Sequence, residues 1–175
     1  MIDLDQLRAI MPHAGKRAEV FLDPLNRAMA EFEIDTPARI AAFLAQVAHE
    51  SGSLRYVEEI ASGKAYEGRS DLGNTEPGDG ERYKGRGLIQ VTGRANYAQC
   101  SEAMFGDPNH LLDHPELLEL PEQAARSAAW FWYSRKLNGL ADAGNFERIT
   151  RKINGGLNGQ ADRLANWELA KAGLA

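Results

Sequence analysis

Apolar residues recur along most of the chain with the spacing of a helix. Leu4, Leu7 and Ile10 predict a first short helix that ends near Pro12. The same periodicity predicts further helices over about 17–32, 37–51, 94–104, 121–136, 146–154 and 160–172. No segment alternates apolar and polar residues over the length of a strand, so a small β-hairpin is the most β-structure that we expect. The pattern predicts a mainly α fold.

The third of these helices has clear start and stop signals. Thr36 is a favourable N-cap residue, and Pro37 suits the first helical position because the N–H there has no helical partner. Gly52 ends the helix. One face of it is apolar and predicts a core helix, with the residues Ile40, Phe43, Leu44 and Val47.

The segment 61–87 breaks with this periodicity. It reads ASGKAYEGRSDLGNTEPGDGERYKGRG, which is rich in glycine and charge and poor in aliphatic residues. We expect a long ordered loop here. A loop of this length inside a globular chain is usually functional.

The composition is that of a globular protein. The chain has 175 residues, of which 43% are hydrophobic and 26% charged, so we expect one domain over 1–175. The formal net charge is −5 and the 20 basic residues form no run, which argues against a nucleic-acid partner but leaves a polyanionic substrate open. The single cysteine, Cys100, excludes a disulfide framework.

The chain shows no targeting or membrane segment. Its N-terminus lacks the apolar stretch of a signal peptide, and no later segment is apolar enough for a membrane anchor. We therefore expect synthesis in the cytoplasm, and nothing in the sequence calls for more than a monomer.

Glu50 is the first candidate for chemistry because it continues the apolar face of its helix, three residues after Val47. A carboxyl group at the edge of a core is partly desolvated, which favours its neutral, proton-donating form. This property suits a general acid. A buried Glu paired with an arginine for structural reasons is an equally open interpretation.

The pair Glu58-Glu59 is the second candidate. A straight helix would place Glu59 some ~13 Å from Glu50, so Gly52 must end the helix and let the chain fold back. Inverting glycosidases hold two carboxyl groups roughly 6.5–9.5 Å apart, with room for a water between base and sugar. A folded-back connection can reach that spacing, whereas a solvated surface pair is the plainer alternative.

The segment YKGRGLIQVTGRANY, residues 83–97, is the third candidate. Its glycines allow close approach of the backbone to a ligand. It offers the amides, hydroxyls and aromatic ring that bind sugars, in the side chains Gln90, Thr92, Asn96 and Tyr97. Arg86 could hold a catalytic carboxylate by bidentate pairing. A structural turn followed by a capped helix is the alternative.

The remaining polar motifs point to structure more than to chemistry. Asn154 precedes two glycines, where an Asn commonly ends a helix. The four histidines are scattered, and His49-Glu50 lacks the second histidine of a zincin helix, so we expect no metal site. No phosphate loop or dinucleotide fingerprint is present, so we expect no cofactor. Cys100 is expected to be a small core residue.

Four motifs taken in order resemble glycoside hydrolase family 19. They are FLAQVAHESGSLRYVEE, AYEGR, YKGRGLIQVTGRANY and ITRKINGGLNG, and they run from about Ala41 to Arg163. The family comprises plant-type chitinases and many phage and bacterial endolysins. The resemblance implies a lysozyme-like, bilobal helical fold with a central cleft. It also implies a metal-free, inverting, single-displacement hydrolysis of β-1,4 links between N-acetylated aminosugars.

The resemblance also assigns roles to residues. Glu50 matches the general acid, Glu59 the general base, and Thr92 the hydroxyl that helps to hold the attacking water. Glu67 in AYEGR is the rival base, because longer chitinases place theirs later, after a tyrosine. The substrate-contacting positions of the family match Gln90, Tyr97 and Asn154, and Arg163 matches a late arginine that organises the carboxylates.

Two departures from the family favour peptidoglycan over chitin: the disulfides of secreted plant chitinases cannot form, and the loops that extend a chitin cleft are absent. We therefore expect an endolysin of lysozyme or muramidase type. It would cut the glycan strand of peptidoglycan in the periplasm, once the membrane is permeabilised, and so lyse the host. A chitinase, a non-catalytic wall-binding virion module and a metallopeptidase are the alternatives.

Overall fold

The computed structural model describes residues 1–175 and is almost entirely helical, as the periodicity predicts. The α-helices are α1 (Leu4–Ile10), α2 (Arg17–Glu31), α3 (Pro37–Glu50), α4 (Asp79–Arg82), α5 (Arg94–Phe105), α6 (His110–Asp113), α7 (Pro121–Ser134), α8 (Leu137–Asp142), α9 (Phe146–Asn154) and α10 (Gln160–Leu174). Three 3₁₀ helices are η1 (Lys64–Tyr66), η2 (Ser70–Leu72) and η3 (Pro115–Glu119). In place of a hairpin, two isolated antiparallel bridges join Glu58 to Arg86 and Arg86 to Val91.

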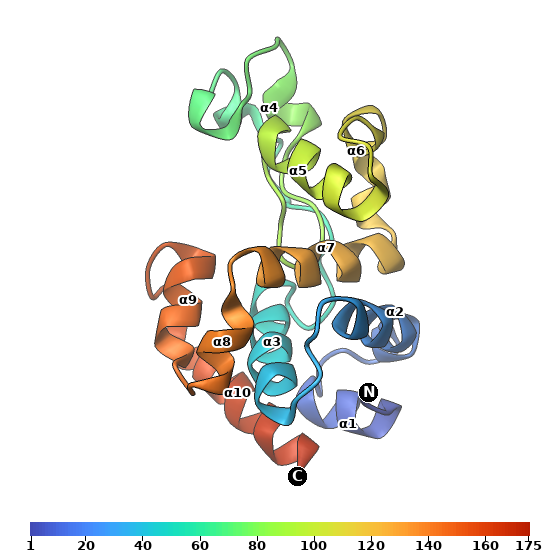
Figure 1. Ribbon diagram of the computed structural model, residues 1–175, viewed down its shortest axis with the longest axis vertical. Helices are drawn as coiled ribbons and strands as arrows, with labels where there is room; N and C mark the ends of the chain where they lie inside the picture. Colours follow the sequence, from blue (N-terminus) through green and yellow to red (C-terminus); the bar gives the residue numbers. More distant parts are fainter.

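The helices form two lobes (Figure 1). One lobe holds α4, α5 and α6, and the other holds α1, α2, α3, α8, α9 and α10, with α7 lying between them. Extended segments on either side of the 61–87 region connect the lobes. The expected bilobal, mainly α architecture is therefore confirmed.

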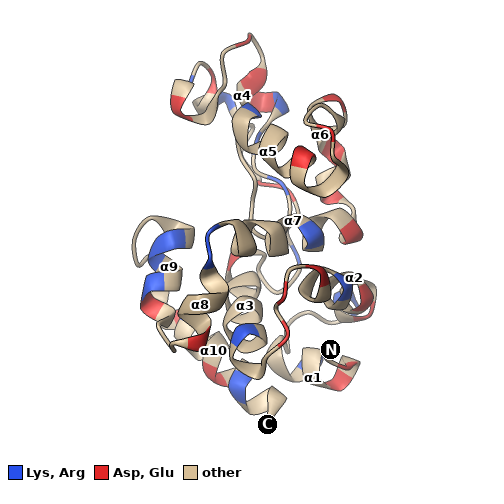
Figure 2. Cartoon of the chain, in the orientation of Figure 1, with Lys and Arg blue, Asp and Glu red and all other residues tan.

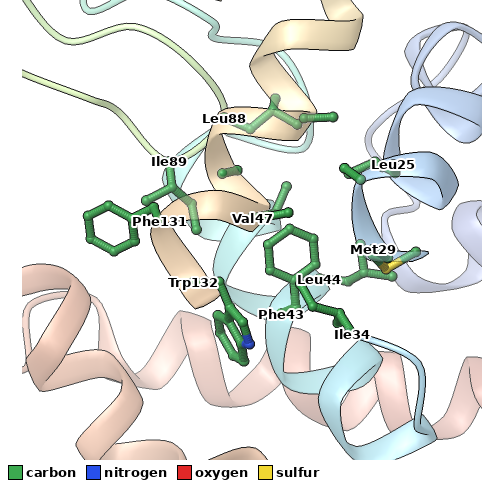
Figure 3. Packing of buried hydrophobic residues seen from close by; sticks show 14 of the residues in the cluster. Leu25, Met29, Ile34, Phe43, Leu44, Val47, Leu88, Ile89, Phe131 and Trp132 are labelled. Carbon is green, nitrogen blue, oxygen red and sulfur yellow. The ribbon is translucent and has the colours of Figure 1, made fainter. Parts of the chain in front are cut away.

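Helix α3 is the centre of the larger lobe, and its apolar face is wholly buried. Phe43, Leu44 and Val47 are all 0% exposed. Phe43 meets the ring of Trp132 from α7 edge to face, with ring centroids 5.5 Å apart. Figure 3 shows Met29 from α2 on the other side of Phe43 from Trp132. Removing a buried Phe side chain typically costs about 3–5 kcal/mol, so this packing holds α3 in its place in the lobe.

The two ends of α3 follow from local sequence. The Thr36 hydroxyl accepts a hydrogen bond from the N–H of Arg39 at 3.3 Å, and Pro37 opens the helix. After Glu50 the chain turns sharply, because Gly52, Ser53 and Leu54 all have positive φ of 57–66°. Left-handed backbone is unfavourable for residues with a side chain, by about 1–2 kcal/mol each. The strained turn lies directly beside Glu50.

The region 61–87 is ordered, as expected, but it contains η1, η2 and α4. Along with α6, η3 and α8, these elements have only three to six residues. One helical turn is too short to show an apolar period, so the sequence pattern misses them. No helix is both long and apolar enough to cross a bilayer.

Candidate active site

A cleft of about 390 Å³ opens where α3 ends. The segment after α3, helix η1 and the segment before α5 form the rest of its wall. The lining residues are Glu50, Tyr56, Glu58, Glu59, Ile60, Ala61, Tyr66 and Gln90. Three of the four sequence motifs therefore meet in one cleft, and the two first-choice carboxyl groups share it.

Glu50 is held from α10 by a buried arginine. Arg163 is 1% exposed, and its Nη2 lies 2.6 Å from Glu50 Oε1, although no N–H points squarely at that oxygen. The same guanidinium donates to Gln46 Oε1 at 2.5 Å and to the carbonyl of Asn158 at 3.1 Å. Gln46 in turn donates to the hydroxyl of Thr150 at 2.9 Å. The side chain of Glu50 is 25% exposed, so one side faces the cleft while the other is fixed.

A second contact between α3 and α10 lies one residue away. His49 Nδ1 is 2.6 Å from Asp162 Oδ2. A methyl group added at Gly159 would lie 2.3 Å from His49 Cε1, so only glycine allows the ring this close to the start of α10. The pairs His49–Asp162 and Glu50–Arg163 together form what we call the α3–α10 clasp.

Glu59 has one oxygen engaged and one free. Its Oε2 accepts a hydrogen bond from the Tyr66 hydroxyl at 3.1 Å. Its Oε1 is buried and has no hydrogen-bond partner. Burial first, and then the charge of Glu59, raise the pKa of Tyr66 above its ordinary value, so the tyrosine keeps its proton and acts as donor. The protein therefore leaves one acceptor of Glu59 without a donor.

The backbone around Gly85 sets the position of Glu59. The carbonyl of Gly85 accepts the N–H of Glu59 at 2.9 Å. A methyl group at Gly85 would lie 2.7 Å from Glu59 Oε2 and 2.6 Å from Gln90 Oε1. Such distances are shorter than van der Waals contact, so the absence of a side chain at Gly85 lets both groups lie where they do.

Arg86 does not hold a catalytic carboxylate, contrary to our expectation. Its Nε donates to Glu119 at 2.7 Å, and its Nη1 donates to the Arg82 carbonyl at 2.8 Å and to the Tyr97 hydroxyl at 3.1 Å. Successive side chains of an extended segment point to opposite faces. Since the neighbouring Gly85 faces Glu59, Arg86 faces away from it.

Tyr97 also lies away from the cleft. It is 0% exposed, and its hydroxyl donates to the carbonyl of Lys84 at 2.6 Å. Burial raises the pKa of Tyr97 far above its ordinary value, so the hydroxyl is a permanent donor that braces the segment before α5. In this structure Tyr97 does not reach the position of a substrate contact.

Thr92 lines a second, smaller hollow next to the cleft. This hollow has a volume of about 30 Å³, and Gln90 lines both spaces. Its other lining residues are Val91, Asn96, Trp130, Phe131 and Arg135. The carbonyl of Thr92 accepts the side-chain amide of Asn96 at 2.8 Å. Thr92 is thus beside the cleft and not among the residues that line it with the two glutamates.

The other candidates have structural partners. Both oxygens of Glu67 are engaged by backbone N–H groups, from Gly78 at 2.7 Å and Gly80 at 2.8 Å, which closes the 61–87 loop on itself. Glu58 forms an ion pair with Lys84. Asn154 is exposed at the end of α9, where its Oδ1 accepts the N–H of Asn158 at 3.3 Å.

Sequence reasoning missed Gln46, Thr150 and Tyr66. Gln46 carried a usable signal, since it is a polar residue inside an apolar run and lies four positions before Glu50, on the same face of the helix. Thr150 and Tyr66 lie within the quoted motifs, but no pattern indicated their roles, because their contacts join segments that are distant in sequence or irregular in shape.

A match to a family sequence model decides which family the chain belongs to. The model described as chitinase class I, of glycoside hydrolase family 19, matches residues 29–141. The chain belongs to glycoside hydrolase family 19. A glycosyl hydrolase family 19 domain-containing protein of Haemophilus influenzae is 31% identical over 154 residues, 70% of this chain and 74% of that protein. Membership of the family makes the chain a glycoside hydrolase.

Other relatives are longer. An endochitinase of Arabidopsis thaliana is 44% identical over 118 residues, which cover 67% of this chain and 39% of the plant protein. The crystal structure of chitinase C from Streptomyces griseus superimposes with a TM-score of 0.81 at 23% identity, over 99% of this chain and 76% of that one. This similarity confirms the lysozyme-like helical fold of family 19.

Proposed function

We propose that the chain hydrolyses β-1,4 glycosidic bonds of bacterial peptidoglycan by single displacement with inversion, with Glu50 as general acid and Glu59 as general base. The observation that carries the assignment is the shared cleft, in which one carboxyl group is fixed by Arg163 and the other has a free, buried oxygen. An inverting mechanism requires two carboxyl groups that face the same substrate.

Each group has a defined task in this mechanism. Glu50 gives its proton to the glycosidic oxygen, and Arg163 then stabilises the carboxylate that remains. Glu59 takes a proton from the attacking water, while the Tyr66 hydroxyl holds its Oε2 in place. The sugar passes through a state of oxocarbenium character, and no covalent intermediate forms. Gln90 and Thr92 are proposed to orient the sugar and the water from the cleft and its adjoining hollow.

The rival bases are less suited to this role. Glu67 accepts two backbone hydrogen bonds, and using it as a base would open the loop that it closes. The carboxylate of Glu58 is already engaged in an ion pair with Lys84. Asn154 is proposed to contact substrate only from the rim, since it is exposed at the end of α9.

Hydrolysis of chitin oligomers is the second candidate. It is favoured by the relatives, since the Arabidopsis thaliana and Streptomyces griseus proteins are named as chitinases. Peptidoglycan is preferred because the chain has a single, buried cysteine in place of the disulfides of secreted plant chitinases.

The test is a digest of purified peptidoglycan beside colloidal chitin with wild type, Glu50→Gln, Glu59→Gln and the control Glu102→Gln, an exposed residue of α5. General acid–base catalysis typically contributes about 100- to 10,000-fold, so both catalytic variants should lose activity by that factor while the control matches wild type. Mass spectrometry of the new reducing ends identifies the bond. NMR of the first product anomer checks inversion, and a retained anomer would refute the mechanism.

Endolysin action is the proposed biological consequence. Expression of the chain in a Gram-negative host should leave cells intact until a pore-forming protein or solvent permeabilises the inner membrane, and should then lyse them. The Glu50→Gln variant should bind walls without lysing cells. Wall binding by both wild type and Glu50→Gln, with lysis by neither, would point instead to a binding module.

A further inference from the structure

An arginine with no carboxylate partner stands at the edge of the cleft. Arg135 follows α7 and lines the small hollow that Gln90 shares with the catalytic cleft. Its guanidinium carbon lies 3.5 Å from the centroid of the Phe131 ring, and Nη1 donates to the Ser134 hydroxyl at 3.2 Å. Burial lowers the pKa of Arg135, and no carboxylate opposes this effect.

The other buried arginines of the region are paired. Arg86 binds Glu119 and Arg163 binds Glu50. A guanidinium has five N–H donors, and Arg135 uses one of them on a neighbouring hydroxyl. Partial burial of a cation without an anion is unfavourable, and an anion that arrives with the substrate would remove that cost when the site is in use.

The hollow has the size for a small polar group. Its volume of about 30 Å³ is less than a tenth of the 390 Å³ of the cleft, so it cannot take a sugar ring. Thr92 and Asn96 line it with a hydroxyl and an amide. A carboxylate that projects sideways from a glycan lying in the cleft would meet Arg135 there.

The surroundings of Arg135 are positive in a chain whose net charge is −5. Lys136 is its neighbour in sequence and is exposed. Lys152 of α9 donates from Nζ to the carbonyl of Arg135 at 3.3 Å. Figure 2 shows Lys and Arg on α9 and on the segment between α7 and α8. This local charge attracts an anionic substrate more than a neutral one.

We propose that Arg135 determines specificity by binding a carboxylate of the stem peptides of peptidoglycan, and so favours that glycan over chitin. Chitin carries N-acetylated sugars but no carboxylate, whereas the stem peptides carry several. The planar guanidinium suits bidentate pairing with a carboxylate. This inference rests on the proposed function and names the group of the substrate that distinguishes the two candidate glycans.

The experiment compares kcat/KM on three soluble substrates: peptidoglycan fragments, the same fragments with their carboxylates amidated, and chitin oligomers. Arg135→Gln should lower kcat/KM on untreated fragments about tenfold, the factor expected for one partly exposed charge-assisted hydrogen bond. Amidation of the fragments should lower kcat/KM of wild type by the same factor, and it should not lower kcat/KM of Arg135→Gln any further. On chitin oligomers the two proteins should agree within about twofold.

Controls separate charge, fold and substrate class. Lys16→Gln removes an equal charge at the N-cap of α2, outside both spaces, and should match wild type on all substrates. Arg135→Lys keeps the charge without the planar fork and should give an intermediate loss on untreated fragments only. Equal loss on all three substrates would overturn the inference and leave the proposed function standing. Wild type that cuts chitin and no form of peptidoglycan would overturn both.

Discussion

Replacing Arg163 by methionine tests the support of the proposed acid. Methionine has a similar length and fills part of the space, but it has no charge and no donor. The change leaves Glu50 without its cation and removes the donor from Gln46 Oε1 and from the carbonyl of Asn158. Arg163 itself is 1% exposed, so water cannot readily take its place.

The expected loss of stability follows from these contacts. A buried acceptor left without a donor costs about 1–3 kcal/mol, and breaking a buried ion pair about 3–5 kcal/mol. Glu50 is 25% exposed and can be partly hydrated, which places its share at the low end. The low end of each range, about 1 kcal/mol for each of the two acceptors and about 3 kcal/mol for the pair, gives an expected loss of about 5 kcal/mol. This corresponds to roughly 10–20 °C in Tm for a chain of this size.

The effect on turnover should exceed what the loss of stability explains. A displacement of about 1 Å in a catalytic group can lower the rate about 100-fold, and Glu50 has no other partner to hold it. We therefore expect kcat to fall about 100-fold at a temperature where the variant is fully folded. Arg148→Met, at an exposed position of α9, is the control and should change stability by no more than about 0.5 kcal/mol.

Chemical denaturation and steady-state kinetics measure the two effects. Adding Gln46→Met to Arg163→Met should cost less than the separate changes together, because the orphaned amide oxygen is removed with its donor. If Arg163→Met unfolded within about 1 kcal/mol of wild type and kept kcat within threefold, the ion pair would not be what positions Glu50.

Three further changes test other parts of the site and its support. Gly85→Ala should displace Glu59 and lower kcat about tenfold or more with little change in Tm. Steady-state kinetics equal to those of wild type would contradict the close approach of the Gly85 backbone to Glu59. Tyr66→Phe should lower kcat about tenfold by freeing the base, measured across pH. Because the pKa of Tyr66 is raised above its ordinary value of 10.0, the folded state holds that proton longer, so wild type should lose stability as pH rises past 10.0 and Tyr66→Phe should lose less. Asp79→Asn should destabilise the smaller lobe by about 2–3 kcal/mol at pH 7, since Arg94 holds the pKa of the 2% exposed Asp79 carboxyl below 3.8. Chemical denaturation at pH 3 should show a smaller difference in stability between the variant and wild type. Equal losses of stability at both pH values would refute the ion pair as the cause.

The sequence predicted the parts of the fold in which one local signal is strong. Helix α3 has a capping threonine, a proline at its first position and a glycine after its end, and α9 was predicted to the residue. The short helices α6 and α8 were not predicted, because each is stabilised by packing against its neighbours and has no apolar pattern of its own.

The same distinction separates the site residues. The motifs indicated Glu50 and Glu59 because the order of the motifs along the chain can be recognised from the sequence alone. The structure places both glutamates in one cleft. They could not show that Arg86 points the other way, because a change of one position in an extended segment reverses the face. The partners of Glu50 and Glu59 depend on contacts between distant segments, so they required the structure.

The α3–α10 clasp has a consequence for the timing of activity. Glu50 is synthesised early, whereas Asp162 and Arg163, which hold the end of α3, belong to the last helix. A nascent chain on the ribosome therefore carries both glutamates of the cleft long before the first of them is fixed. A glycoside hydrolase made in this order would remain inactive until α10 has emerged and docked.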